Sequence, residues 1–183
     1  MDSSFTRRSF LAVPGALAAG PAMLMGQSPN EAVHVAFIGV GNRGAFLEKH
    51  MMNVPGIQVV AICDINPDTL AAAIAAAQKN GHKPTGYADF RKMLDADKSI
   101  DAVVIATPVN THKEIAMTAL EMGKHVYEEK PMGLTPEECN QLVAASKTAK
   151  GIFQAGFQLR HDPARAASMQ FIHSGGLGKV LYL

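Results

Sequence analysis

The chain has 183 residues, of which 48% are hydrophobic and 18% charged, and its formal net charge at pH 7 is +1. This length is enough for one full domain with a buried core and a little more. Since the charge is close to zero, there is no broad attraction to nucleic acid or to an anionic membrane, and neither is an expected partner. The two cysteines, Cys63 and Cys139, are expected to be small buried hydrophobes rather than a disulfide pair.

Residues 1–30 have the organisation of an export signal. Arg7-Arg8 precede Phe10-Leu11 and a mildly apolar stretch that extends to Met25. This stretch resembles a twin-arginine signal peptide, although Ala12 stands where such signals usually carry lysine. The stretch is too short and too interrupted by Gly and Pro for a membrane span. We therefore expect periplasmic export by the twin-arginine machinery without a stable membrane anchor, and a disordered cytosolic tail is the alternative.

A glycine-rich turn follows the first predicted strand, residues 33–38. The turn, Gly39-Val40-Gly41-Asn42-Arg43-Gly44, fits the pattern G-x-G-x-x-G. The first glycine of this pattern allows a tight turn, the second lets the backbone approach a pyrophosphate, and the third lets the next helix pack closely. The pyrophosphate then lies at the helix N-terminus, where free N–H groups favour an anion. A purely structural turn is the alternative.

A second predicted strand, residues 57–63, ends at Asp64. This acid lies 20 residues after Gly44, where a carboxylate that binds the adenosine ribose is expected. Asp64 would favour NAD over NADP by repelling a 2′-phosphate. Arg43 could stack on adenine or contact a 2′-phosphate, or it could remain solvated at the helix start. NAD is therefore the expected cofactor, and NADP stays open.

Helices and strands alternate along the rest of this region. The predicted helices are residues 43–53, a segment that Asn66-Pro67-Asp68 begins and Asn80-Gly81 ends, and residues 89–95, 111–122 and 135–147. The further predicted strands are residues 85–87, 101–106, 125–128 and 151–157. This alternation predicts an α/β domain over residues 31–157, with a Rossmann-type doubly wound parallel sheet.

The pattern changes after Phe157. Residues 162–173 are predicted to be helical, residues 174–178 form a turn, and a strand begins at Lys179. We interpret residues 158–183 as the truncated start of a second, α+β domain. The chain is accordingly expected to be the N-terminal fragment of a longer protein.

Short motifs in a fixed order add a resemblance to a known family. They are the glycine turn, Cys63-Asp64, Tyr87-Ala88-Asp89-Phe90, Ala106-Thr107-Pro108-Val109-Asn110-Thr111-His112, Gly123-Lys124-His125-Val126-Tyr127-Glu128-Glu129-Lys130-Pro131, and Gly156-Phe157-Gln158. Over residues 33–183 this set resembles the glucose-fructose oxidoreductase/inositol dehydrogenase/MocA-type (Gfo/Idh/MocA) family, and the signal resembles that of its exported branch. The resemblance implies an NAD(P) cofactor, a sugar or polyol substrate, and homo-oligomers formed through the β-sheet of the second domain.

The resemblance also implies roles for residues that follow two strands. Thr107-Pro108 would lie along the nicotinamide, followed by Asn110 and His112, although a packing or capping role is the alternative for His112. Glu129 would orient or contact the nicotinamide ribose. Lys130 would be the catalytic residue, which donates to the reacting hydroxyl or carbonyl and stabilises alkoxide charge. A surface lysine is the alternative, and the family suggests a cis bond before Pro131.

The last implied contacts follow the final predicted strand. Gln158 would contact the cofactor and Arg160 the substrate, and an interdomain salt bridge is the alternative for Arg160. The predicted cofactor residues are thus Gly39, Gly41, Asn42, Arg43, Gly44, Asp64, Thr107, Pro108, Asn110, His112, Glu129, Lys130 and Gln158. No cluster of histidines, cysteines and carboxylates has metal-ligand spacing.

Three functions remain in competition. The first is an NAD(P)-dependent oxidoreductase that transfers a hydride between nicotinamide and a hydroxyl-bearing carbon of a sugar or polyol. The second is a glycosidase of the same family, which oxidises its sugar transiently, eliminates the aglycone and reduces the product again. The third is a nucleotide-binding module that has no enzymatic activity of its own, because one wall of the substrate pocket belongs to the missing domain. The Glu-Lys-Pro motif favours the first.

Overall fold

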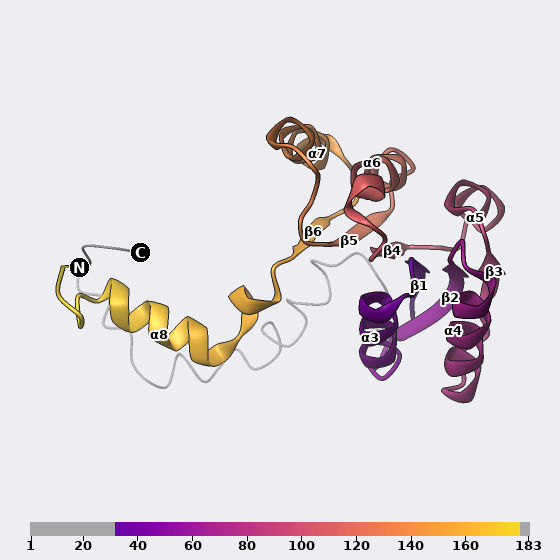
Figure 1. Cartoon of the computed structure of the whole chain (residues 1–183), viewed down its shortest axis with the longest axis horizontal. Helices are drawn as coiled ribbons and strands as arrows, with labels where there is room; N and C mark the ends of the chain where they lie inside the picture. Colours follow the sequence, from indigo (N-terminus) through magenta and orange to yellow (C-terminus); the bar gives the residue numbers. More distant parts are fainter. Residues whose placement is uncertain (1–31, 180–183) are drawn as a thin grey trace, which may run out of the picture. The chain divides into compact units, whose positions relative to one another are not determined.

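The computed structural model describes residues 32–179. The predicted export signal, residues 1–30, and the last predicted strand, which begins at Lys179, lie outside the described residues except for Lys179 itself. The described chain contains a sheet of six parallel strands in the order β3-β2-β1-β4-β5-β6 (Figure 1). The strands are β1 (Val33–Ile38), β2 (Ile57–Cys63), β3 (Thr85–Tyr87), β4 (Ala102–Ile105), β5 (His125–Glu129) and β6 (Phe153–Gly156). This order confirms the predicted doubly wound sheet.

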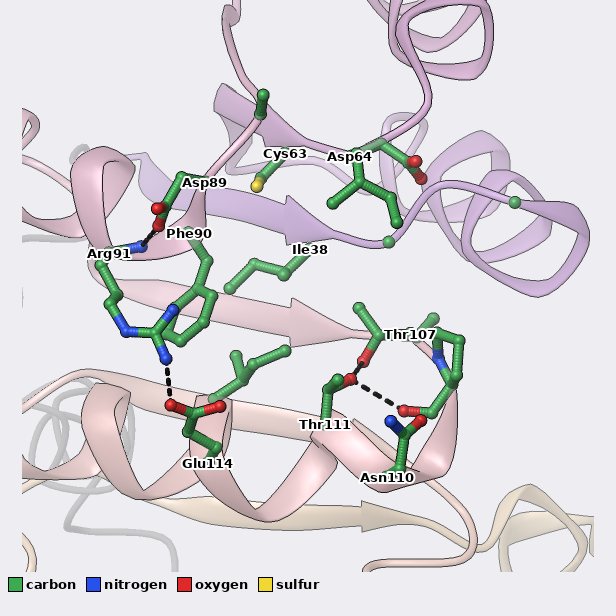
Figure 2. Close-up of a pocket in the computed structure, with 17 residues that line it drawn as sticks. Ile38, Cys63, Asp64, Asp89, Phe90, Arg91, Thr107, Asn110, Thr111 and Glu114 are labelled. Carbon is green, nitrogen blue, oxygen red and sulfur yellow. Dashed lines mark hydrogen bonds and ion pairs between the residues drawn. The ribbon is translucent and has the colours of Figure 1, made fainter.

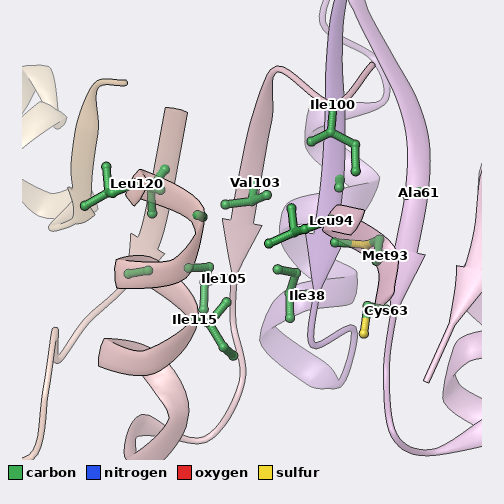
Figure 3. Close-up of a cluster of buried hydrophobic side chains, with 14 of the residues drawn as sticks. Ile38, Ala61, Cys63, Met93, Leu94, Ile100, Val103, Ile105, Ile115 and Leu120 are labelled. Atoms are coloured by element: carbon green, nitrogen blue, oxygen red, sulfur yellow. The ribbon is translucent and has the colours of Figure 1, made fainter. Parts of the chain in front are cut away.

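Helices connect the strands and cover both faces of the sheet. They are α3 (Asn42–Met51), α4 (Pro67–Lys79), α5 (Phe90–Ala96), α6 (His112–Glu121) and α7 (Pro136–Thr148), and α8 (Pro163–His173) follows β6. Side chains of α4 share one apolar cluster with β1 and β2. Side chains of α5, α6 and α7 form a second cluster on β1, β2, β4 and β5 (Figure 3). Because helices lie on both faces, β4 and the second part of β1, residues 35–38, are apolar on both sides of the sheet.

Local signals position the ends of most helices as expected. The Asn66 side chain accepts hydrogen bonds from the backbone N–H groups of Asp68 and Thr69, and Pro67 occupies the first turn of α4. The Thr135 hydroxyl caps α7 in the same way. The helix predicted over residues 43–53 ends earlier, at Met51, because the Asn53 side-chain amide donates to the Lys49 carbonyl and closes the last turn.

Two predicted strands are shorter than expected. The strand predicted over residues 101–106 is one residue shorter at each end in the structure, where it is β4. The flanking Asp101 N and Ala106 N still donate hydrogen bonds to the carbonyls of His34 and Ile38 in β1. The strand predicted over residues 151–157 is shorter in the structure, where it is β6.

Cys63 is buried and Cys139 is half-buried, and both thiols are free. Within residues 32–179, no helix combines the length and the apolar character that crossing a membrane requires.

Two glutamates are buried among apolar side chains. Both carboxyl oxygens of Glu128, which is 0% exposed, and Oε1 of Glu48 have no hydrogen-bond partner within the described part of the chain. Burial raises the pKa of Glu128 to about 8 and that of Glu48 to about 7. At neutral pH the folded chain therefore holds the Glu128 carboxyl mainly in its protonated form.

This burial predicts that stability falls as pH rises. The folded state binds the Glu128 proton more tightly than the unfolded state does. The contribution of this proton to the free energy of unfolding is therefore complete below the ordinary pKa of 4.5, and it is lost as pH rises through about 8. Glu128→Gln should flatten this decline by roughly 4 kcal/mol in the free energy of unfolding, measured by urea denaturation at pH 5 and pH 9. The exposed Glu121→Gln is the control. An identical pH dependence in wild type and Glu128→Gln would contradict the prediction.

Candidate functional site

The glycine turn lies at the carboxyl edge of the sheet, between β1 and α3. Gly39 has a φ of +82°, and a Cβ there would lie 2.8 Å from Cγ2 and the backbone nitrogen of Thr107. A Cβ on Gly44 would overlap the Gly39 carbonyl oxygen. These two positions require glycine for different reasons, the first for its conformation and close approach and the second for helix packing alone.

Gly41 differs from both, because a Cβ there would meet no heavy atom of the described residues within 4 Å. Gly41 is also the N-cap of α3, its φ of −64° is accessible to any residue, and no side chain caps this helix. No acidic side chain occupies the first turn of α3. The helix therefore presents N–H groups beside open space, which is the arrangement that accommodates a pyrophosphate.

Asp64 lies at the end of β2 and connects two backbone segments. Its Oδ2 accepts a 2.8 Å hydrogen bond from Val40 N in the glycine turn, and its Oδ1 accepts one of 2.8 Å from Asn66 N. The carboxylate thus orients the turn, and each oxygen keeps a lone pair that can accept from a ribose hydroxyl. Sequence reasoning missed this second role, which the Asp-x-Asn-Pro spacing, typical of an Asx turn, could have suggested.

The first pocket is a cavity of about 620 Å³ beside Asp64, at the ends of β1, β2 and β4 (Figure 2). Its volume lies in the range of sites for small molecules and cofactors. The wall contains Asp64, Thr107, Pro108 and Asn110, as predicted for a cofactor site. The other predicted members that line it are Gly39 and Gly41.

Several wall residues of the first pocket had no predicted role, among them Phe90, Arg91 and Glu114. Arg91 pairs with Glu114 across α5 and α6, and its guanidinium lies 4.4 Å from the centre of the Phe90 ring. Figure 2 shows this ion pair opposite the glycine turn. The ion pair joins two helices that are distant in sequence, so no local pattern identified it.

The second pocket, about 460 Å³, lies between the glycine turn and the end of β5. Arg43 Nε and Nη2 lie 2.7 and 2.6 Å from Oε1 of Glu129, and the Tyr127 hydroxyl donates to the same oxygen at 3.2 Å. The hydrogen bond to Glu129 raises the pKa of Arg43, while burial and the Glu129 charge raise the pKa of Tyr127. Arg43 lines this second pocket, whereas Asp64 lines the first pocket.

Lys130 follows Glu129 and lines the second pocket together with Gln158. The Lys130 side chain is exposed, and its ammonium has no hydrogen-bond or ion-pair partner among residues 32–179. The Lys130–Pro131 peptide bond is cis, as the family resemblance suggested. The structure thus brings Arg43, Glu129, Lys130 and Gln158 together around one cavity.

His112 also borders the second pocket but is only 2% exposed. Its Nδ1 lies 2.8 Å from the Pro131 carbonyl oxygen and its Nε2 lies 2.9 Å from the Thr107 carbonyl oxygen. Both ring nitrogens thus face backbone oxygens and neither remains for a cofactor. The direct cofactor contact expected for His112 does not fit this geometry, and the packing alternative does.

Three predicted residues lie apart from both pockets, and one of them is Gly44, which packs against the Gly39 carbonyl. Asn42 borders a groove between α3 and α4, and the Arg160 guanidinium lies 4.8 Å from the centre of the Phe157 ring. None of the residues from 32 to 179 form a group of three or more histidines, cysteines and acids that could hold a metal ion.

The parallel sheet, the glycine turn and the acid at the end of β2 define a dinucleotide-binding Rossmann domain. Residues 33–157 match the family model described as "Oxidoreductase family, NAD-binding Rossmann fold" (GFO_IDH_MocA). The chain therefore belongs to the Gfo/Idh/MocA oxidoreductase family, as the motifs indicated.

Similar proteins include both hydrolases and dehydrogenases. A glycosyl hydrolase family 109 protein from Shewanella pealeana is 38% identical over 189 residues, which cover 100% of this chain and 41% of that protein. The structure resembles myo-inositol 2-dehydrogenase from Lactobacillus plantarum, with a TM-score of 0.74 and 29% identity over 83% of this chain and 44% of that one. It also resembles scyllo-inositol dehydrogenase from Lactobacillus casei with bound NAD(H) and scyllo-inositol, with a TM-score of 0.72 and 26% identity over 81% and 43%. The chain spans less than half the length of these proteins.

Proposed function

We propose that this protein is an NAD-dependent oxidoreductase acting on a hydroxyl-bearing carbon of a sugar or polyol. The observation that carries the proposal is the pair of adjacent pockets, one containing Asp64 and the other Lys130, which share Ala106 and Thr107. Both pockets lie at the carboxyl edge of the sheet, where β1 and β4 are neighbours and the strand order reverses. Open α/β sheets bind their ligands at this point.

The residues of the chain fit a dinucleotide. Open space at Gly41 and the uncapped start of α3 accommodate the pyrophosphate, and Asp64 would accept from the adenosine ribose. The 2′-phosphate of NADP would lie against the Asp64 carboxylate and be repelled by it. Arg43, which could attract that phosphate, is instead paired with Glu129 and does not line the first pocket. This arrangement supports NAD over NADP.

When bound, NAD supplies the hydride acceptor or donor at nicotinamide C4. Lys130 would hold the substrate oxygen through its ammonium, stabilise negative charge on that oxygen, and exchange a proton with it. Glu129, whose carboxylate is held by Arg43 and Tyr127, gives the second pocket a fixed wall next to Lys130. Gln158, which also lines this pocket, would contact the cofactor.

A glycosidase is the second candidate, because the relative from Shewanella pealeana is named a glycosyl hydrolase family 109 protein and matches along the whole chain. Such a function would use the same nucleotide site, with a cofactor that returns to its starting redox state. The Glu129-Lys130-Pro131 motif and the inositol dehydrogenases among the similar structures support the dehydrogenase.

One experiment separates these functions. The purified chain is denatured to identify any released nucleotide, titrated with NAD⁺ and NADP⁺, and then assayed with inositols and with chromogenic nitrophenyl glycosides. We expect tighter binding of NAD⁺ than of NADP⁺, and NADH formation with a polyol. Aglycone release without net NADH would favour the glycosidase, binding without turnover would favour a nucleotide-binding module, and no nucleotide binding would contradict all three.

We also propose export by the twin-arginine pathway, supported by Arg7-Arg8 and the apolar stretch after them. This pathway carries folded proteins, so a tightly held cofactor could be acquired in the cytoplasm. Homo-oligomers formed through a second domain remain a prediction of the family resemblance. Fractionation of cells that produce the chain, compared with an Arg7→Lys/Arg8→Lys variant, tests the export.

A further inference from the structure

The Glu129 carboxylate is enclosed by groups from α3, β5 and β6. Glu129 is 5% exposed, and its Oε1 accepts hydrogen bonds from Arg43 Nε at 2.7 Å and from the Tyr127 hydroxyl at 3.2 Å, with Arg43 Nη2 at 2.6 Å. A Cβ on Gly156 would lie 3.1 Å from Glu129 Cδ and 2.9 Å from the Tyr127 hydroxyl oxygen. The carboxylate is therefore closely surrounded and has little room to turn away from Arg43.

Arg43 supplies the positive charge that balances this carboxylate. It lies in the first turn of α3, and its guanidinium carbon is 5.1 Å from the centre of the Phe46 ring on the same helix. The ring and the ion pair together hold the guanidinium in place. A buried carboxylate that loses its positive partner keeps an uncompensated charge, which is unfavourable away from water. Without Arg43, Glu129 would therefore attract another cation.

Lys130 is the cation that could replace Arg43. Arg43 and Lys130 are the two residues of the arginine and lysine type that line the second pocket. The Lys130 backbone N–H donates to Oε2 of Glu129 at 3.3 Å, so the carboxylate lies beside the Lys130 backbone. The Lys130 ammonium nonetheless has no ion-pair partner among residues 32–179. Since lysine carries one compact charge, an ammonium that paired with Glu129 would be withdrawn from a substrate oxygen.

We propose that Arg43 is a positioning residue, which neutralises Glu129 and thereby keeps the Lys130 ammonium free for the substrate. The inference rests on the proposed function for its consequence in turnover, whereas the competition between Arg43 and Lys130 for Glu129 is measurable without it. Three variants of the full chain separate the possibilities. Arg43→Met removes the charge but keeps a long side chain, Arg43→Lys keeps the charge, and Arg43→Met/Glu129→Gln removes both charges of the pair.

The first test follows the Lys130 amine itself. The full chain is treated with a trace of acetic anhydride, and acetylation of Lys130 is measured by mass spectrometry relative to the exposed Lys150 in the same molecules. An amine that pairs with a carboxylate keeps its proton and reacts more slowly, so Lys130 should react about three- to tenfold more slowly in Arg43→Met than in wild type. Arg43→Lys and the double variant should react as wild type does. Arg165→Met, which removes an exposed arginine from α8, is the control and should also leave the rate unchanged.

Two labelling results would overturn the inference. One is equal acetylation of Lys130 in wild type and in folded Arg43→Met. The other is faster acetylation of Lys130 in Glu129→Gln than in wild type, because it would mean that Glu129 already holds the Lys130 ammonium. The second comparison does not depend on whether an Arg43 variant folds.

The second test is turnover. Where the wild type turns over a polyol, kcat of Arg43→Met at saturating NAD⁺ should fall by about 10- to 100-fold, and the added Glu129→Gln substitution should restore most of this loss. If Arg43 contacted the substrate or the cofactor directly, the double variant would be no more active than Arg43→Met, and that result would overturn the inference. Absent NAD⁺ binding by wild type would overturn the proposed function instead, while the labelling still decides the inference.

Discussion

Lys130→Ala should lower kcat for polyol oxidation by about 10²- to 10⁴-fold, the usual contribution of a positioned acid or base. Lys130 is exposed at the end of β5, and its ammonium is free of partners among residues 32–179, so its removal disturbs no described interaction. The proposed contacts to the pyrophosphate and the adenosine ribose lie elsewhere, at the glycine turn and Asp64. The affinity for NAD⁺, measured by calorimetry, should therefore stay within about threefold of wild type.

The matched control is Lys150→Ala, which removes another exposed lysine just before β6, at the opposite end of the strands. It should change neither turnover nor NAD⁺ affinity. Turnover of Lys130→Ala at the wild-type rate would show that Lys130 is a surface lysine. A parallel loss of NAD⁺ affinity and kcat would show that it serves the cofactor instead of the substrate.

Gly44→Ala and Gly41→Ala should separate folding from nucleotide binding, although both lie in one turn. A Cβ on Gly44 would overlap the Gly39 carbonyl oxygen, so α3 must move away from the turn. We expect a loss of about 3 kcal/mol in the free energy of unfolding, the upper part of the range for overpacking. Gly41→Ala adds its methyl group to open space and should leave stability within about 0.5 kcal/mol of wild type.

For NAD⁺ binding by the folded chains, Gly41→Ala should be the more damaging of the two substitutions. The methyl group of Gly41→Ala projects where the pyrophosphate would approach the backbone, so NAD⁺ affinity should fall by at least about tenfold. Urea denaturation and calorimetry on the same preparations provide both measurements. Equal NAD⁺ affinity in Gly41→Ala and wild type would mean that the pyrophosphate does not lie at this turn.

Local signals in the sequence predicted the fold closely. The six strands alternate with helices, and their caps, such as Asn66 and Thr135, act within three residues of the bonds they make. Such interactions depend on spacing along the chain, which the sequence displays directly. The end of α3 was predicted less well. The helix was expected to reach Asn53 but ends at Met51, where the Asn53 side-chain amide donates to the Lys49 carbonyl.

The site was predicted less completely, because its bonds join residues that are distant in sequence. The motifs identified most of the residues that line the two pockets. They did not show that Arg43 pairs with Glu129, 86 residues away, or that Arg91 pairs with Glu114. Such pairs depend on side-chain directions at neighbouring strand ends, for which spacing alone carries no information.

The Rossmann sheet, the glycine turn, the acid after β2 and the lysine after β5 were all predicted before the structure, because each follows from periodicity, turn chemistry or a contiguous motif. How these parts are held became visible in the folded structure. Arg43 lies in the second pocket, both nitrogens of His112 face carbonyl oxygens, and the buried Glu128 carboxyl has no hydrogen-bond partner among residues 32–179. Burial and hydrogen bonding depend on which strands become neighbours, and the chain establishes those neighbours only when the sheet forms.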